Sequence, residues 1–197
     1  MDMIVNSRES FMFVNVDNRL FQIVRNSEYV DKSEIITLTN QVIDTEERFI
    51  CVTRPRRFGK SVTVKMLNAY YSKGCDSKAL FSDLKIASSP DFEKHLNQHD
   101  VIYLDMTEFA DNKDNGIRYL ENLNTDVVSE LKDTYPEYFK KDKDYSLPEA
   151  IRCLGKRFIF IIDVLVLNCS FFAGLLLELF VLGGAGGENV NVRLSKS

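Results

Sequence analysis

The sequence contains no tryptophan, only two histidines and no pair of cysteines in a C-x-x-C arrangement. Its four cysteines are scattered, which indicates a reducing, intracellular setting and argues against a metal-binding knuckle. Lys and Arg number 25 against 29 Asp and Glu, so the net charge of −4 excludes a chain-wide basic surface for nucleic acid. No basic segment followed by an apolar run stands at the N-terminus, so we expect no secretory signal and a cytoplasmic protein.

The sequence does have the length and composition of a globular domain. Its 197 residues are 45% hydrophobic and 27% charged, which is enough apolar content for a buried core. Three short runs of β-branched and aromatic residues are predicted strands, and they cover residues 49–52, 101–104 and 158–162. Such continuous runs are typical of buried parallel strands. Because helical patterns alternate with these runs, we predict an α/β fold.

Capping residues and apolar periodicity predict five helices, with the strands between them. Their expected boundaries are Asp31 to about Leu38, Lys60 to Gly74, Ser89 onward, Ile117 to Pro136, and Ser146 to Gly155. Ser146 and Glu149 form a capping-box pattern, and Ser89 precedes a proline in the way that an N-cap does. His95 and His99 have a spacing that can ligate zinc, but we interpret them as a solvated helix face because no third ligand is evident.

The most informative segment is residues 53–61, which read T-R-P-R-R-F-G-K-S. It follows a predicted strand and opens a predicted helix, which is the context of a phosphate-binding loop. Gly59 would let the backbone approach a phosphate, Lys60 would reach the β- and γ-phosphates, and the Ser61 hydroxyl would hold Mg²⁺. The candidate nucleotide-binding residues are Arg54, Pro55, Arg56, Arg57, Phe58, Gly59, Lys60 and Ser61.

The match to the general loop pattern is incomplete, because Arg54 stands where that pattern has its first glycine. Local charge nevertheless favours an anionic ligand, since residues 49–74 carry six basic residues and no acidic one. A solvated basic turn at a helix start is the alternative interpretation. Two acidic residues end predicted strands and are candidates for organising Mg²⁺. We prefer Asp163, which follows the longer apolar run, and interpret Asp105 as capping a turn.

Residues 29–33 (Y-V-D-K-S) and 53–61 together resemble the bacterial AAA-ATPase-like family, whose members carry Y-V-D-K-[ST] and then T-R-P-R-R-F-G-K-[ST]. Arg54 fits this family pattern. The resemblance continues through residues 69–74, 92–96, 101–105 and 156–163. It implies a P-loop NTPase-like parallel sheet flanked by helices, with ATP and Mg²⁺ as ligands. The predicted division is an N-terminal segment (1–28), a P-loop domain (29–163) and a divergent tail (164–197).

The resemblance stops at Asp163. Family members continue there with Glu, an aromatic residue and Asp, whereas this chain continues with Val164 and an apolar run. The glutamate would polarise the attacking water, so the resemblance implies ATPase activity while Val164 puts hydrolysis in doubt. We therefore expect the sheet to be incomplete at the C-terminus, and a shift of reading frame just after the Asp163 codon. DNA sequencing around that codon tests this hypothesis, because an alternative frame should encode the missing motif.

The tail permits another interpretation. Residues 158–182 contain two charged residues, Asp163 and Glu178, and are long enough to span a bilayer. Because residues 159–163 match a soluble strand, we favour an aberrant tail over a membrane anchor. The alternative function is a nucleic-acid-binding or membrane-tethered module that uses the basic loop without nucleotide chemistry, although the net charge does not support nucleic acid. The sequence leaves the oligomeric state open.

Overall fold

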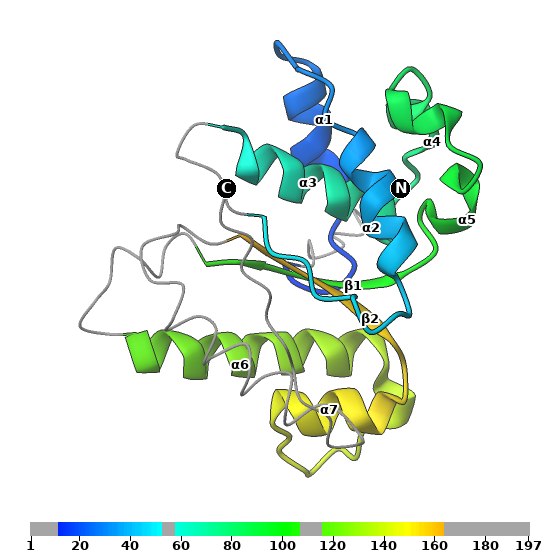
Figure 1. Ribbon diagram of the computed structural model, residues 1–197. Coiled ribbons are helices and arrows are strands. Elements are labelled where there is room, and N and C mark those ends of the chain that lie inside the picture. The colour runs from blue at the N-terminus through cyan, green and yellow to red at the C-terminus, as the bar shows by residue number, and fades with distance from the viewer. Residues whose placement is uncertain (1–11, 53–57, 107–115, 164–197) are drawn as a thin grey trace, which may run out of the picture.

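The computed structural model describes residues 12–52, 58–106 and 116–163, with the backbone alone for 116–120 (Figure 1). The helices are α1 (Arg19–Arg25), α2 (Glu34–Val42), α3 (Lys60–Tyr71), α4 (Lys78–Phe81), α5 (Phe92–His95), α6 (Gly116–Thr134) and α7 (Leu147–Leu154), with the 3-10 helices η1 (Lys85–Ser88) and η4 (Pro136–Tyr138). The strands are β1 (Asp100–Asp105) and β2 (Phe158–Asp163). The predicted α/β class is therefore confirmed.

The two strands pair in parallel, in a register that runs from Asp100 opposite Phe158 to Asp105 opposite Asp163. At its other edge β1 meets the segment around Val14, which forms an antiparallel bridge with Ile102. The backbone N–H of Tyr103 donates to the Phe13 carbonyl at 2.8 Å. Strand β1 is thus hydrogen-bonded on both sides, as expected for a strand with an almost wholly buried run of side chains.

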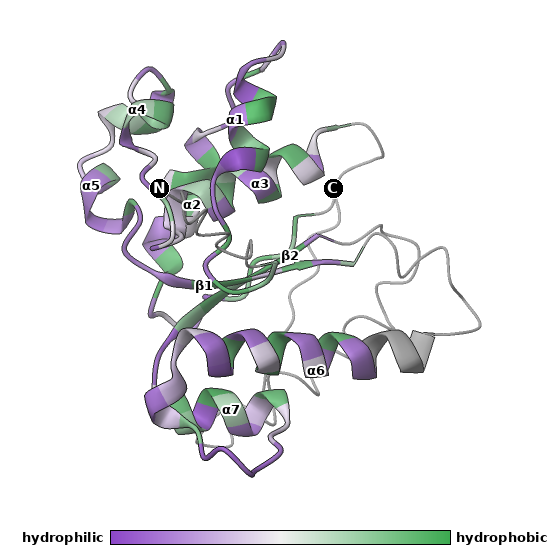
Figure 2. Cartoon of the chain, turned by 180° about the vertical axis from the view of Figure 1, so that it is seen from behind, coloured by the Kyte–Doolittle hydropathy of each residue, from purple (hydrophilic) through white to green (hydrophobic). Residues whose placement is uncertain are grey.

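Helices cover both faces of this sheet, with α1, α2 and α3 on one side and α6 and α7 on the other (Figure 1). Successive side chains of a strand point to opposite faces. Tyr103 and Ile161 accordingly belong to one apolar cluster with Met66 of α3, while Ile102 belongs to another with Leu131 of α6. Figure 2 shows the hydrophobic strands lying between the two helical layers. The α3 layer and the α6–α7 layer are the names used for these two sides below.

The predicted strand at residues 49–52 is wrong. These residues have no regular secondary structure, and the side chains of Phe49, Ile50 and Val52 are 37%, 49% and 40% exposed. An apolar run becomes a strand only where a backbone ladder continues along it, and the sheet of the described residues contains β1 and β2. Composition alone does not reveal whether a neighbouring strand is there to pair with.

Three predicted helix ends are also wrong. Helix α2 has Ser33 rather than Asp31 as its N-cap, and the four-residue α5 has Asp91 rather than Ser89. Helix α3 ends at Tyr71 rather than at Gly74. Gly74 serves a close backbone approach instead, since a Cβ there would overlap the Asn15 carbonyl oxygen.

In the α6–α7 layer the predicted boundaries hold. Helix α6 ends just before Pro136, and α7 opens on the predicted capping box. The Glu149 carboxylate accepts hydrogen bonds from the backbone N–H and the hydroxyl of Ser146, at 3.1 and 3.3 Å. Gly155 follows α7 with φ at +58°, the left-handed conformation that suits glycine.

Several predictions concern residues outside the described ranges. They are the binding residues Arg54, Pro55, Arg56 and Arg57, and everything proposed for residues 164–197, including the apolar tail and the shifted frame. Within the described ranges, every helix is too short or too polar to cross a bilayer. The division into segments 1–28, 29–163 and 164–197 stays a prediction.

Candidate functional site

The first candidate residues that the structure describes lie at the N-terminus of α3. Gly59 is the N-cap and has φ at +79°, a conformation that glycine adopts with little strain. Its carbonyl accepts hydrogen bonds from the backbone N–H and the hydroxyl of Thr63, at 3.0 and 3.1 Å, so the helix begins directly after it. Lys60 is half-buried and Ser61 is exposed. The first N–H groups of a helix have no acceptor within the helix and carry its positive dipole end, which suits an anion.

Helix α3 brings this terminus to the carboxyl ends of the strands. The C-terminal end of α3 lies at the start of β1, where Ser72 forms a bridge with His99 and the Lys73 N–H donates to the His99 carbonyl at 2.9 Å. From there the helix runs back along the sheet (Figure 1). Twelve residues of helix rise about 18 Å and six residues of strand about 20 Å. Gly59, Lys60 and Ser61 therefore lie over the end of the sheet where both strands stop.

Two carboxylates stand at that same end. Asp105 and Asp163 are in register across the β1–β2 pair, and strands of one sheet lie about 4.8 Å apart. By alternation both belong to the face of Tyr103 and Ile161, which is the face that α3 covers. Asp163 is 4% exposed, whereas Asp105 is exposed. Burial of a carboxylate is costly without a cation or hydrogen-bond donors nearby, so Asp163 suits a site that holds a cation.

Tyr103 lies one step deeper on this face. It is 5% exposed, and its hydroxyl finds no hydrogen-bond partner among the residues that the structure describes. Burial raises the pKa of Tyr103 well above its usual value, and the negative charges of Asp105 and Asp163 raise that pKa further. A buried hydroxyl in this condition is typical of a place where water or a ligand completes the hydrogen bonding.

These groups fit a magnesium ion with a phosphate ligand. Mg²⁺ prefers carboxylate and hydroxyl oxygens and binds through few protein ligands, because waters and substrate phosphates complete its coordination. Ser61 and Asp163 supply such oxygens from two neighbouring elements. Within the described ranges, no group of three or more His, Cys, Asp or Glu side chains forms a site for a more fully coordinated metal.

A further segment reaches this site from before α2. In residues 29–33 every second side chain is anchored inward. The Tyr29 hydroxyl donates to the Met66 sulfur of α3 at 3.2 Å, and the Ser33 hydroxyl accepts the Ile86 N–H at 3.1 Å. The Asp31 carboxylate accepts the N–H groups of Ser33 and Lys85, at 2.8 and 2.9 Å. Burial alone would raise the pKa of Asp31, but these hydrogen bonds outweigh it and hold the pKa below its usual value.

The intervening side chains of this segment are exposed, and one of them contacts the start of α3. The Lys32 ammonium donates a hydrogen bond to the Phe58 carbonyl at 2.8 Å. It also lies 2.8 Å from the place that a Cβ on Gly59 would occupy, so a larger residue at position 59 would displace the end of the Lys32 side chain. The sequence prediction missed Lys32. Residues 29–33 entered that prediction only through the family resemblance, and no local pattern connects residues 32 and 58.

The two histidines do not form the solvated helix face that was predicted. Helix α5 ends at His95, and the chain turns so that the two rings stack with centroids 5.2 Å apart. The His95 Nδ1 and the His99 Nε2 lie 3.0 Å apart, and His95 is 7% exposed. The turn at Asn97, which has φ at +54°, is the reason that a helical spacing gave the wrong geometry.

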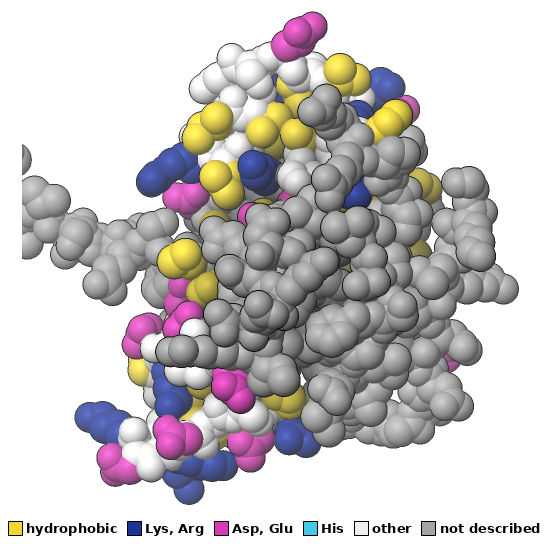
Figure 3. All heavy atoms as spheres, turned by 90° about the vertical axis from the view of Figure 1, so that its left-hand side faces the viewer, with side chains coloured by type: hydrophobic (Ala, Val, Ile, Leu, Met, Phe, Trp, Pro, Cys, Tyr) yellow, Lys and Arg dark blue, Asp and Glu magenta, His cyan; other side chains and the backbone are white. Residues whose placement is uncertain are grey.

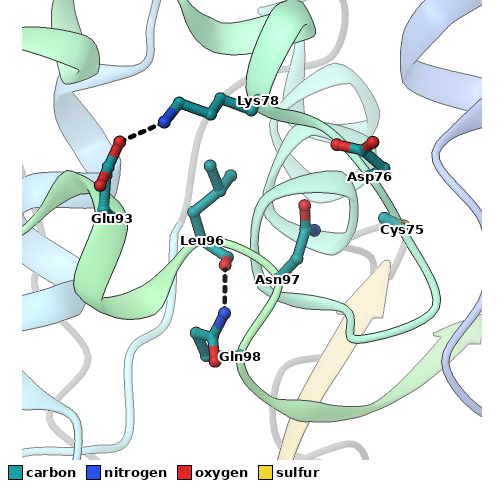
Figure 4. A pocket seen from close by; sticks show the side chains of 7 residues that line it. All are labelled: Cys75, Asp76, Lys78, Glu93, Leu96, Asn97 and Gln98. Carbon is teal, nitrogen blue, oxygen red and sulfur yellow. Dashed lines mark hydrogen bonds and ion pairs between the residues drawn. The ribbon is translucent and has the colours of Figure 1, made fainter.

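A surface hollow lies away from this site, after the C-terminal end of α3 (Figure 4). It is lined by Cys75, Asp76, Lys78, Glu93, Leu96, Asn97 and Gln98, and the ion pair of Lys78 with Glu93 lies across it. The Cys75 thiol donates to the Val16 carbonyl at 3.4 Å, and burial raises the pKa of this thiol. Cys75 is therefore poorly suited to act as a nucleophile.

Figure 3 faces the end of the molecule where the strands stop, and in its upper part hydrophobic side chains gather with Lys and Arg side chains among them. The exposed apolar residues of the α3 layer include Val30 and Phe58, at 70% and 56% exposure. Nothing in the described residues favours a nucleic-acid or membrane module over a nucleotide site, and the basic residues 54, 56 and 57 lie outside them.

Comparison with known proteins gives one match. A family model described as a predicted AAA-ATPase matches residues 19–165, a span that includes residues 29–33, the start of α3 and both strand-end acids. No curated protein and no solved structure matches the chain.

Proposed function

Since the chain belongs to the AAA-ATPase-like family of predicted AAA-ATPases, we propose that it binds Mg-ATP at the N-terminus of α3, in a P-loop NTPase-like domain. One observation carries the proposal. The left-handed Gly59 and the residues Lys60 and Ser61 begin a helix whose N-terminus lies over the strand ends, on the face that carries Asp163. An anion site and a cation site at one edge of a sheet are what a magnesium-bound triphosphate requires.

Each group has a chemical role in this proposal. The backbone N–H groups at the start of α3 bind phosphate oxygens, and the Lys60 ammonium adds a charge-assisted hydrogen bond. The Ser61 hydroxyl and the Asp163 carboxylate hold Mg²⁺, which neutralises phosphate charge when bound. Arg54, Arg56 and Arg57 add positive potential from the preceding loop.

The direct test is calorimetric titration of the full chain with Mg-ATP. Removing a charged contact to phosphate costs about 1.5–3 kcal/mol, so Lys60→Ala should weaken binding roughly ten- to a hundredfold. Lys78→Ala is the matched control, because Lys78 is an exposed lysine whose ion pair with Glu93 lies across the distant hollow. Equal affinities of the parent and Lys60→Ala would refute the site.

The metal ligands need a separate measurement. Asp163→Asn should reduce the gain in ATP affinity that Mg²⁺ produces while leaving metal-free ATP binding nearly unchanged. Titrations with ATP in the presence of Mg²⁺ and in excess EDTA measure that gain. A gain as large in Asp163→Asn as in the parent would remove Asp163 from the site.

We expect slow ATP hydrolysis, because Val164 stands where the family has the glutamate that polarises water. Loss of a general base typically lowers the rate about 10²–10⁴-fold. Steady-state phosphate release measures the rate, with Lys60→Ala as the background control. Turnover near 1 s⁻¹, on the order of an ordinary enzyme's kcat, that Lys60→Ala abolishes would contradict this expectation.

A further inference from the structure

We propose that Lys32 is a second phosphate-binding lysine of this site, delivered to the start of α3 by the anchored segment 29–33. The inference rests on the proposed function, because its ligand is the phosphate chain of the same Mg-nucleotide. It assigns a binding role to a residue 26 positions before the Phe58 carbonyl that it contacts.

The segment that carries Lys32 is fixed on both sides of it. The Asp31 carboxylate accepts the Lys85 N–H of η1, and the Ser33 hydroxyl, which is fully buried, accepts the neighbouring Ile86 N–H. The side chains before and after Lys32 therefore point into the protein, whereas Lys32 is exposed and lies against the start of α3. A lysine whose backbone is held in this way loses less conformational freedom on binding a ligand than one on a free loop.

The ammonium lies at the turn that presents the first N–H groups of α3. It is 2.8 Å from the Phe58 carbonyl oxygen and 2.8 Å from the position of a Cβ on Gly59. An ammonium has three N–H donors, and the hydrogen bond to Phe58 uses one of them. Two donors remain for an oxygen that binds beside Gly59.

The charge of Lys32 also lacks the carboxylate partner that three other described lysines have. Lys73, Lys78 and Lys85 form ion pairs with Asp100, Glu93 and Glu34. Among the described residues, by contrast, no carboxylate forms an ion pair with Lys32, whose hydrogen bond goes to a neutral carbonyl. A cation held without a carboxylate next to a helix N-terminus adds to the positive potential there and favours a polyanion.

A purely structural role is the alternative, in which Lys32 only holds the Phe58 carbonyl and keeps Gly59 in its turn. Two readouts separate the roles. A charge that contacts phosphate makes binding more sensitive to ionic strength, whereas a turn held by a hydrogen bond does not. Arginine keeps the charge and would restore binding, whereas glutamine keeps an N–H donor without the charge.

The experiment measures Mg-ATP affinity of the full chain by calorimetry at several NaCl concentrations, for the parent, Lys32→Gln, Lys32→Arg, Lys60→Ala and the control Lys78→Gln. We expect Lys32→Gln to weaken binding roughly ten- to a hundredfold and to flatten its salt dependence. Lys32→Arg should recover most of the affinity, and Lys78→Gln should match the parent. Thermal unfolding without nucleotide identifies any variant that fails to fold. If Lys32→Gln does not fold, Lys32→Met, which keeps the length of the side chain without its charge, replaces it in the salt comparison with the parent.

The outcomes separate this inference from the proposed function. Parent-like binding by Lys32→Gln, with binding lost in Lys60→Ala, overturns the role of Lys32 and leaves the nucleotide site standing. Weak binding by Lys32→Gln with the salt dependence of the parent and no recovery in Lys32→Arg assigns Lys32 to the turn and also overturns the inference. Absence of Mg-ATP binding by the parent overturns both.

Discussion

The two helical layers combine apolar burial and side-chain hydrogen bonds in different arrangements. In the α3 layer, side-chain hydrogen bonds tie the helices to one another. The Tyr71 hydroxyl donates to the Asn40 amide oxygen at 2.7 Å, and the Tyr70 hydroxyl donates to the Phe92 carbonyl at 2.7 Å. The Asn68 amide donates to the Val16 carbonyl at 3.1 Å. Asn68, Tyr70 and Tyr71 all belong to α3, so the three bonds also fix the helix that begins after Gly59.

The α6–α7 layer has a largely aliphatic core together with hydrogen bonds of its own. The Glu130 carboxylate of α6 accepts the N–H groups of Phe13 and Val14, both at 2.8 Å, and the Asn124 amide oxygen accepts the Leu147 N–H of α7 at 2.9 Å. The buried residues that α6 and α7 contribute are Val127, Val128, Leu131, Leu147, Ala150 and Leu154, and they pack against Ile102 and Leu104 of β1. Packing of this kind is strong but has little directional preference. The comparison teaches that both layers combine apolar burial with side-chain hydrogen bonds, and that in the layer which positions the candidate site several of those hydrogen bonds are made by α3 itself.

Among the substitutions that test this comparison, we expect the largest loss of stability in the α6–α7 layer. Leu131→Ala removes a fully buried side chain, and such a change costs about 2–5 kcal/mol of unfolding free energy. Leu131→Met, which conserves volume, should cost less than about 1.5 kcal/mol. Urea denaturation measures both. A loss for Leu131→Ala no larger than for Leu131→Met would show that this layer is not packed as described.

A smaller loss is expected in the α3 layer. Tyr71→Phe keeps the ring but removes the hydroxyl that bonds Asn40, leaving a buried amide oxygen without its donor, at a cost of about 1–3 kcal/mol. Tyr138→Phe is the control, because Tyr138 is 42% exposed and its change should stay within about 0.5 kcal/mol. If Tyr71→Phe is as stable as the control, the directional network does not hold this layer.

The start of α7 gives a local test of the other layer. Ser146→Ala removes the N-cap side chain and should cost about 0.5–2 kcal/mol. Ser129→Ala, at an exposed position inside α6, should not destabilise, since alanine favours helix interiors. Thermal unfolding of the two variants compares them directly, and equal midpoints would contradict the capping role.

The smallest expected effect is a pH dependence confined to the α3 layer, where both histidines lie. Burial lowers the pKa of His95 and His99, and nearby positive charge, from Lys94 and from His95 respectively, lowers each further. An unfolded histidine has a pKa of about 6.5. The histidine contribution to stability is therefore complete above about pH 6.5 and is lost as the pH falls through the folded-state values.

Replacing both histidines with glutamine should flatten this slope in urea denaturation between about pH 5 and 7. Asp100 does not contribute to the change in stability between about pH 5 and 7. Burial would raise the pKa of Asp100, but hydrogen bonds from Lys73 and Tyr135 hold it below its usual value, so its contribution is lost only near or below about pH 4. If the free energy of unfolding of the parent protein does not change between about pH 5 and 7, the histidine effect is disproved.

Sequence-based prediction succeeded where the signals were local. The Ser146–Glu149 box and Gly155 lie within one or two turns of the helix ends that they set, and both ends of α7 are confirmed. Gly59 likewise marks the start of α3 through its own backbone conformation. The predictions for Asp31, Gly74 and residues 49–52 were wrong because their outcomes depend on segments far away in the chain, such as the Lys85 N–H that bonds Asp31 and the Asn15 carbonyl beside Gly74.

The amino-acid sequence by itself determined the α/β class, the parallel strands ending in Asp105 and Asp163, and a helix that begins after Gly59. Each of these follows from apolar periodicity or from the conformational preference of a single residue. Only the tertiary structure decided that Lys32 contacts Phe58, that both acids lie on the face covered by α3, and that Tyr103 carries a buried hydroxyl between them and the core. Lys32 and Phe58 are 26 positions apart in the chain, and Asp105 and Asp163 are 58 positions apart. The packing of whole helices and strands brings such pairs together, and no local conformational preference specifies that packing.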